Sequence, residues 1–172
     1  MFKPSIYWVS DIHPYRLALM PRPRGGEWLE EEVSALKECG VDLVVSLLEV
    51  HEVRELELNA EATVCTAYGI EFLSFPIQDR GVPSSTQSFS MLLAQLHTHL
   101  QAGRSIAIHC RAGIGRTGLT AGCLLHLLNV PYKNIFPTLS RSRGISVPDT
   151  SAQIEWVEKF VRTGSSSFQL FR

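Results

Sequence analysis

The stretch AIHCRAGIGRTG, residues 107–118, places a cysteine and an arginine where together they could bind and attack a phosphate. Cys110 and Arg116 bracket five residues, so both belong to one short loop. A cysteine thiolate is a strong nucleophile. The planar fork of an arginine can grip two phosphate oxygens, which a lysine does less well. This spacing predicts a nucleophile held against a bound phosphate ester.

The same stretch also contains G-x-G-x-x-G, formed by Gly113, Gly115 and Gly118, which is the pattern of a dinucleotide-binding loop. Such a fold places its glycine loop after the first strand and an acid about 20 residues downstream, where it holds the ribose. Here the chain beyond Gly118 reads as helices, and the nearest downstream acid is Asp149. The context therefore favours the cysteine interpretation.

The elements around Cys110 suit a phosphate site. A strand expected at 105–109 ends directly before it, and Gly113 and Gly115 let the backbone curl so that successive N–H groups point inward. A helix beginning near Gly115 adds the positive end of its dipole. The same donors stabilise a thiolate, so we expect the pKa of Cys110 to lie well below that of a free cysteine.

Strands that alternate with helices predict an α/β fold, with a central, largely parallel sheet of four to five strands flanked by helices. Functional sites in such folds lie beyond the carboxyl ends of the strands. We expect strands at 5–9, 41–49, 69–77 and 105–109, and helices at 27–40, 51–67, 84–103, 115–128, 131–141 and 150–162.

The bulk properties indicate one globular domain, which we place at 1–164, followed by a tail at 165–172. Apolar residues make up 45% of the 172, which argues against disorder. The four cysteines show neither C-x-x-C pairing nor zinc-like spacing, and no signal peptide or membrane-length apolar run is evident. We expect a cytoplasmic protein with reduced thiols, without metal or cofactor, that binds no nucleic acid and has no stable membrane anchor.

Charge is unevenly distributed along the sequence. Residues 27–61 carry eleven acids and two bases, whereas residues 80–148 carry no Asp or Glu. The bases in the acid-free segment suggest a field that attracts anions, although any single one could be an ordinary solvated residue. Among them, Arg141 and Arg143 could line the entrance of the site or brace its loop.

The segment HCRAGIGRTG resembles the signature loop, H-C-x5-R-[ST], of the cysteine-dependent protein tyrosine and dual-specificity phosphatases. The resemblance covers most of the chain and implies a dual-specificity phosphatase-like fold. It implies that Cys110 becomes a phosphocysteine, that Arg116 steadies the transferring phosphoryl group, that Thr117 helps the cysteine leave and that His109 positions the loop. The phosphate-binding residues it implies are Arg111, Ala112, Gly113, Ile114, Gly115 and Arg116.

The resemblance also implies a proton donor, since the family keeps an aspartate on a loop some thirty residues before the cysteine. Asp79, in FPIQDRGVPSS, occupies that place. Its carboxyl group would protonate the leaving oxygen and then activate the water that cleaves the thiophosphate. An ordinary turn aspartate is the alternative. Gln153 resembles, by location only, the glutamine that assists the water step in larger tyrosine phosphatases; a solvated helix glutamine is the alternative.

The expected substrate is a phosphorylated protein or peptide. Asp79 is preceded by Ile77-Gln78 rather than Trp-Pro, and no tyrosine-bearing recognition loop is evident near the N-terminus. Both features favour a shallow site that accepts phosphoserine and phosphothreonine as well as phosphotyrosine. Phosphoinositide members of the superfamily often carry lysines inside the loop; here Ala112 and Ile114 are apolar, so that alternative is less favoured.

Two further alternatives remain open. The D-x-H at Asp11–His13 opens metallophosphoesterase sites, but these need later Asp, Asn and His clusters that this chain lacks. A non-catalytic phosphoprotein-binding module is also conceivable. Inactive relatives usually lose the cysteine, the arginine or the acid, and all three are present here.

Overall fold

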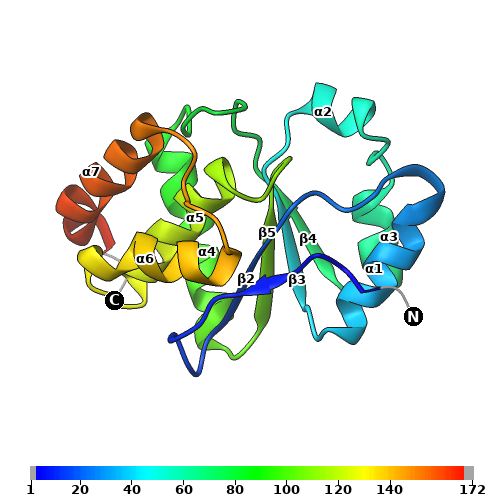
Figure 1. Ribbon diagram of the computed structural model, residues 1–172, viewed down its shortest axis with the longest axis horizontal. Helices are drawn as coiled ribbons and strands as arrows, with labels where there is room; N and C mark the ends of the chain where they lie inside the picture. Colours follow the sequence, from blue (N-terminus) through cyan, green and yellow to red (C-terminus); the bar gives the residue numbers. More distant parts are fainter. Residues whose placement is uncertain (1–2, 169–172) are drawn as a thin grey trace.

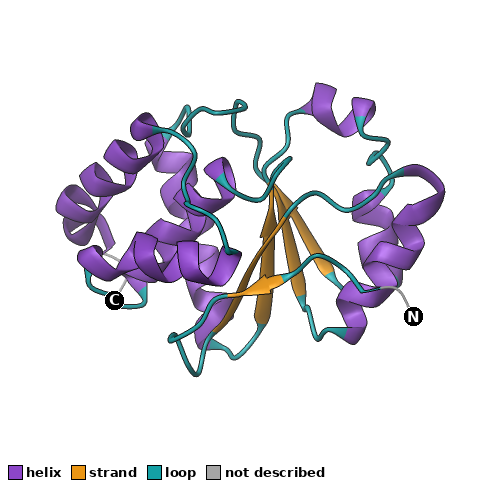
Figure 2. Cartoon of the chain, viewed as in Figure 1, coloured by secondary structure: helices purple, strands orange, loops and turns teal. Residues whose placement is uncertain are grey.

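The computed structural model describes residues 3–168, in which strands and helices alternate along most of the chain (Figures 1 and 2). The strands are β1 (Tyr7–Trp8), β2 (Arg16–Met20), β3 (Leu43–Ser46), β4 (Glu71–Ser74) and β5 (Ser105–His109). The helices are a short 3-10 turn η1 (Gly26–Trp28), then α1 (Leu29–Glu38), α2 (Val50–Glu55), α3 (Glu61–Ala67), α4 (Thr86–Gln101), α5 (Gly115–Leu127), α6 (Tyr132–Arg143) and α7 (Ser151–Phe168).

The five strands form one sheet in the order β1-β2-β5-β3-β4. β2, β5, β3 and β4 are parallel to their neighbours, and only β1 pairs antiparallel, with β2. This confirms the expected largely parallel sheet. The central strand is β5, and the parallel strands all end at the upper edge in Figure 1, so the loop that begins at Cys110 emerges at the middle of that edge.

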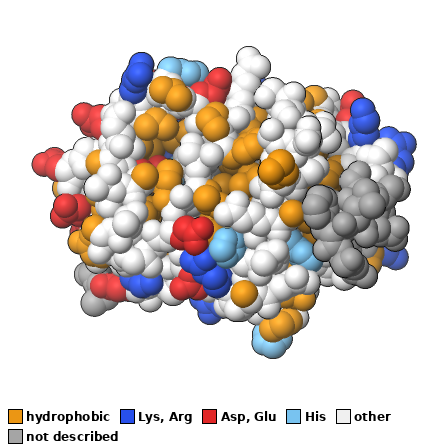
Figure 3. Space-filling view, turned by 180° about the vertical axis from the view of Figure 1, so that it is seen from behind, with side chains coloured by type: hydrophobic (Ala, Val, Ile, Leu, Met, Phe, Trp, Pro, Cys, Tyr) orange, Lys and Arg blue, Asp and Glu red, His pale blue; other side chains and the backbone are white. Residues whose placement is uncertain are grey.

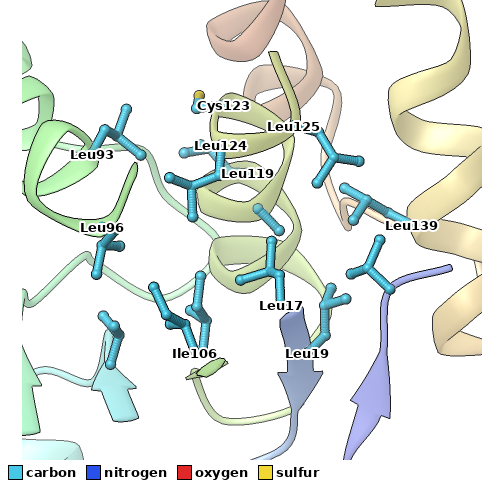
Figure 4. Packing of buried hydrophobic residues seen from close by; sticks show 14 of the residues in the cluster. Leu17, Leu19, Leu93, Leu96, Ile106, Leu119, Cys123, Leu124, Leu125 and Leu139 are labelled. Carbon is cyan, nitrogen blue, oxygen red and sulfur yellow. The ribbon is translucent and has the colours of Figure 1, made fainter. Parts of the chain in front are cut away.

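Both faces of the sheet are covered by helices, with α4, α5, α6 and α7 on one face and α1 and α3 on the other (Figure 1). Alternate side chains of β2 and β5 divide between the two cores: Leu17, Leu19 and Ile106 belong to the first, Ala18 and Ala107 to the second. Helix α5 lies at the centre of the first core, between α4 and α6. Its contacts are shown in Figure 4, where Leu119, Leu124 and Leu125 lie above Leu17, Leu19 and Ile106.

Helix α4 confirms the expected periodicity. Five apolar side chains at helical spacing are buried on one face, and the Ser85 hydroxyl caps the helix by accepting a hydrogen bond from Ser88 N. The buried residues are Phe89, Leu92, Leu93, Leu96 and Leu100.

The structure differs from the sequence-based expectation in three places. Strand β2 is not among the strands expected from the sequence; RLALM is a short apolar run that pairs in parallel with β5. The single helix expected at 51–67 is interrupted after α2, where Glu57 has a left-handed φ of 55°. Helix α7 continues past 162 to Phe168, into the expected tail, whose residues 169–172 lie outside the described range.

Within residues 3–168, no helix has the length and apolar character needed to cross a membrane.

Candidate active site

The loop at residues 110–116, called the phosphate loop below, joins the central strand β5 to the first turn of α5. Gly113 has φ +68°, and a Cβ placed there would lie 2.3 Å from the carbonyl oxygen of Met20. Only glycine combines that backbone conformation with so close an approach. The end of β2 therefore supports the underside of the loop, and Arg22 N adds a hydrogen bond to Arg111 O (3.2 Å).

Arg143 braces the phosphate loop from α6. Its Nη2 donates to Ala112 O (2.9 Å) and its Nε donates to Gly113 O (3.2 Å), while its guanidinium stacks over the ring of Tyr7. These bonds satisfy two backbone carbonyls of the phosphate loop. Of the two roles weighed for Arg143, the structure selects bracing of the loop.

Cys110 is 3% exposed, and burial by itself raises the pKa of its thiol. The Thr117 hydroxyl, the N–H groups of Thr117 and Ile114 and the charge of Arg116 act in the opposite direction, and the net effect is a pKa below that of an ordinary cysteine. The Thr117 hydroxyl is buried without a nitrogen or oxygen partner among the described residues. The loop is therefore built to hold a thiolate.

Arg116 is fixed at the base of the cavity by two carboxylates from distant parts of the chain. Its Nη1 and Nη2 donate to Glu52 Oε2 (2.6 Å) and Oε1 (3.0 Å), and Nη2 also donates to Asp79 Oδ1 (2.9 Å). A further bond from Nη1 reaches Ile77 O (3.0 Å). Burial raises the pKa of Glu52, but the hydrogen bonds from Arg116, Glu49 N and Arg111 and the charge of Arg116 together outweigh it and lower that pKa to about 2.

Glu52 is not predicted as a site residue from the sequence. It is one of many acids between residues 27 and 61, and nothing in its local pattern marks it as the partner of Arg116. Its placement follows from the fold, which brings α2 on the carboxyl-end side of the sheet close enough for Glu52 to reach Arg116 at the start of α5 (Figure 1).

His109 is completely buried, and its Nε2 lies 2.9 Å from Glu61 Oε1 on α3, as a close ion pair rather than a well-aligned hydrogen bond. Its Nδ1 lies 3.3 Å from Cys110 O. Burial lowers the pKa of His109, but the charge and hydrogen bonding of Glu61 together with the carbonyl and charge of Cys110 outweigh burial and raise it. His109 thus ties β5 to α3 directly beneath the loop. The contact between Glu61 and His109 is likewise not predicted from the sequence.

Asp79 lies on the turn between β4 and α4, on the rim of the same cavity as Cys110. The cavity measures about 310 Å³. Its lining consists of Asp79, Arg80, Cys110, Arg111, Ala112, Ile114, Gly115, Arg116 and Asp149. The structure thus brings together the expected cysteine, loop, arginine and aspartate in one hollow, from segments more than thirty residues apart.

Gln153 is completely buried at the start of α7, beside Gly115 and behind the cavity wall. It is not a solvated helix residue. Its amide oxygen accepts from Asp149 N (3.2 Å) and Thr150 N (3.1 Å), and its Nε2 donates to Gly81 O (3.0 Å). Both ends of the amide are engaged by the protein.

The D-x-H pattern at Asp11–His13 lies between β1 and β2, at the opposite edge of the sheet from Cys110. Asp11 accepts a hydrogen bond from Arg141 Nη2 (2.7 Å), so Arg141 does not line the entrance of the site. The described residues contain no group of three or more His, Cys, Asp or Glu side chains placed to hold a metal ion.

Comparison with known proteins agrees with this geometry. Residues 18–128 match the family described as "Polymorphic toxin system, DSP-PTPase phosphatase", so the chain belongs to the DSP-PTPase phosphatases. Cyclin-dependent kinase inhibitor 3 of Sus scrofa is 28% identical over 134 residues, 77% of this chain and 63% of that protein. The 067L protein of Invertebrate iridescent virus 3, whose name assigns it to the tyrosine phosphatases, is 32% identical over 138 residues, 77% of this chain and 55% of that protein.

The chain therefore spans somewhat more than half the length of these relatives. Among solved structures, kinase-associated phosphatase with its catalytic-site cysteine replaced by serine superposes with a TM-score of 0.84 at 22% identity, covering 96% of this chain and 98% of that one. The two proteins share their fold.

Proposed function

We propose that this chain is a phosphatase that hydrolyses phosphate monoesters on phosphorylated proteins or peptides through a phosphocysteine intermediate. The observation that supports this proposal most strongly is the buried Cys110, with its lowered pKa, in a cavity that Arg116 and Asp79 also line. We place the enzyme in a reducing compartment such as the cytoplasm, because the proposed nucleophile is a thiol.

The proposed reaction has two steps. The Cys110 thiolate attacks phosphorus, the bond to the leaving oxygen breaks, and Asp79 donates a proton to that oxygen. Water then attacks the phosphocysteine, Asp79 takes a proton from the water, and the sulfur leaves as a thiolate that faces the Thr117 hydroxyl. Arg116 and the N–H groups of the phosphate loop bind the non-bridging oxygens in both steps.

The substrate range proposed for this site is phosphotyrosine together with phosphoserine and phosphothreonine. None of the residues that line the cavity is aromatic, so the described site has no stacking partner for a phenyl ring. The phosphoinositide alternative gains no support from the loop, since the side chains of Ala112 and Ile114 offer no charge to additional phosphates.

The test is hydrolysis of p-nitrophenyl phosphate in the presence of EDTA. We expect turnover that survives chelation, stops with vanadate or thiol alkylation, and leaves phosphorus on Cys110 when the reaction is quenched in acid and analysed by mass spectrometry. Cys110→Ser should abolish turnover and retain phosphate binding. A requirement for metal would instead favour the Asp11–His13 interpretation, and phosphopeptide binding without turnover would favour a binding module.

A further inference from the structure

The segment that carries Asp79 is a tight turn, residues 78–81, called the acid turn below. Gly81 N donates to Gln78 O (2.8 Å), and Arg80 adopts φ +58°. A left-handed conformation is unfavourable for a residue with a side chain, by about 1 kcal/mol or more. The acid turn is therefore held by its surroundings rather than by its own sequence.

One anchor of the acid turn is the buried Gln153. Thr150 and Gln153 form a reciprocal capping pair, in which Thr150 Oγ1 accepts from Gln153 N (3.2 Å) and Gln153 Oε1 accepts from Thr150 N (3.1 Å). Capping uses only the amide oxygen. The amide nitrogen is left to donate to Gly81 O (3.0 Å), so a residue in the first turn of α7 also contacts the acid turn.

Gln153 also touches the phosphate loop. A Cβ placed on Gly115 would lie 2.9 Å from Gln153 Oε1 and 3.0 Å from its Nε2. The glutamine amide therefore lies between Gly81 of the acid turn and Gly115 of the phosphate loop. It sets the spacing between the two segments that carry Asp79 and Cys110.

A second anchor is the ion pair between Arg80 Nη1 and Asp149 Oδ2, at 2.7 Å. Both side chains are largely exposed, at 65% and 42%, and exposed pairs contribute about 0–1 kcal/mol. The Gln153 side chain is completely buried, so breaking its bond to Gly81 O would leave an unsatisfied polar group and cost about 1–3 kcal/mol. Gln153 is therefore a stronger anchor of the turn than the Arg80–Asp149 pair. Asp79 itself is also held by Arg116 Nη2, which donates to its Oδ1 (2.9 Å), and through its N–H, which donates to Glu49 Oε2 (3.3 Å).

We propose that Gln153 is a positioning residue for Asp79, which holds the acid turn at the distance from the phosphate loop that proton transfer requires. This proposal rests on the proposed function. It replaces the role in the water step suggested by resemblance to larger tyrosine phosphatases, because both ends of the amide are already bound to backbone groups.

The test compares Gln153→Met with Thr150→Ala. Methionine has a similar volume but cannot donate to Gly81 O, whereas Thr150→Ala removes the other half of the capping pair and leaves the glutamine amide in place. We expect Gln153→Met to lower kcat/KM for a phosphoserine peptide by about tenfold and that for p-nitrophenyl phosphate by less than about twofold, because a poor leaving group needs the acid most. Thr150→Ala should change kcat/KM for the two substrates only slightly and to the same extent.

Hydrogen exchange supplies a readout that does not depend on activity. Backbone amides of residues 78–83 should exchange faster in Gln153→Met and remain as in the unsubstituted protein in Thr150→Ala. If Gln153→Met does not fold, Gln153→Glu replaces it, since the carboxylate can still accept from the capping N–H groups but cannot donate to Gly81 O when ionised.

Equal losses on both substrates together with unchanged exchange would overturn the proposal. If phosphocysteine accumulated in Gln153→Met while exchange at residues 78–83 stayed unchanged, the glutamine would act in the water step without positioning Asp79, which would also overturn it. An unsubstituted protein that hydrolyses neither substrate would refute the proposed function instead. The exchange measurement would then still decide whether Gln153 holds the acid turn.

Discussion

Three buried cysteines in this chain differ in pKa because their immediate neighbours differ. Burial raises the pKa of Cys65 to about 12 and that of Cys123 well above its usual range. Cys110 is buried too, yet its pKa is lowered, because N–H groups, a hydroxyl and the Arg116 guanidinium face its sulfur. At the scale of the residue, reactivity depends on which dipoles point at the sulfur rather than on its exposure.

This difference predicts selective alkylation. Iodoacetamide at neutral pH should modify Cys110 and leave Cys65 and Cys123 intact, as read by peptide mass spectrometry. Because the Cys110 pKa is lowered, alkylation of Cys110 should be fast when the pH is above that pKa. The rate of alkylation should fall as the pH drops through it. Vanadate should protect Cys110. Labelling of Cys65 ahead of Cys110 in folded protein would contradict the assignment.

Asp79 is the second residue whose role can be isolated. Asp79→Ala should reduce turnover of an alkyl phosphate by about 100-fold or more, and turnover of an aryl phosphate with a good leaving group much less. Asp11→Ala, which removes another exposed aspartate paired with an arginine, is the matched control and should leave both rates unchanged. Equal losses on the two substrates in Asp79→Ala would remove it as the proton donor.

At the scale of the elements, the site depends on how a strand, a loop and a helix join. β5 is buried on both faces and α5 is buried from Arg116 to Leu125, so the phosphate loop connects two rigid pieces of the core. Its backbone conformation is imposed from below by the end of β2 and from the side by Arg143. The loop is held in place before any phosphate arrives, which reduces the cost of ordering it on binding.

Because the end of β2 lies against Gly113, Gly113→Ala should strongly reduce both the free energy of unfolding and the binding of vanadate. Its matched control is Gly103→Ala, where φ is +79° but nothing lies within 4 Å of the added carbon. Gly103→Ala should cost about 1 kcal/mol of unfolding free energy, through φ alone, and keep activity. Gly113→Ala should cost more and abolish vanadate binding, because the methyl group meets the Met20 carbonyl. Urea denaturation and vanadate titration measure the two effects; similar losses in both variants would show that β2 does not constrain the loop.

At the scale of the whole molecule, folding brings the acidic and basic halves of the sequence together. Glu52 and Glu55 pair with Arg111, Glu52 pairs with Arg116, and Glu61 pairs with His109. On the face shown in Figure 3, acidic and basic side chains likewise lie next to each other. Bases of the long acid-free segment are therefore paired with acids from other parts of the chain.

The long-range pair of Glu52 and Arg116 predicts a specific pH dependence. The pKa of Glu52 falls from an ordinary 4.5 to about 2 on folding, so its contribution to stability is complete above about pH 4.5 and is lost as the pH falls through about 2. Glu52→Gln should therefore make the free energy of unfolding depend less on pH between about pH 4.5 and pH 2.

At neutral pH, Glu52→Gln should cost about 3–5 kcal/mol, since it leaves the buried Arg116 charge poorly compensated. Glu55→Gln, which removes a partner of Arg111 that is 60% exposed, is the control and should cost less than about 1 kcal/mol. Chemical denaturation between pH 2 and pH 7 compares the two. A Glu52→Gln variant as stable as Glu55→Gln would show that the buried pair does not stabilise the fold.

The sequence by itself determined the features that depend on residues close together in the chain. Alternating apolar segments indicated the layers of helix and parallel sheet, and the contiguous run from His109 to Thr117 placed cysteine, glycines and arginine in one loop, because residues that are neighbours in sequence must be neighbours in space. Helix α4 and its Ser85 cap were predictable for the same reason.

Only the tertiary structure decided which distant residues complete the site. Glu52, Glu61 and the amide of Gln153 reach it from other helices, and β2 becomes a strand by pairing with β5. The residues next to a carboxylate in the sequence do not reveal which distant side chain it will pair with, since the pairing depends on how whole elements pack across the sheet. Local patterns specify elements, whereas the contacts between elements exist only after the chain has folded.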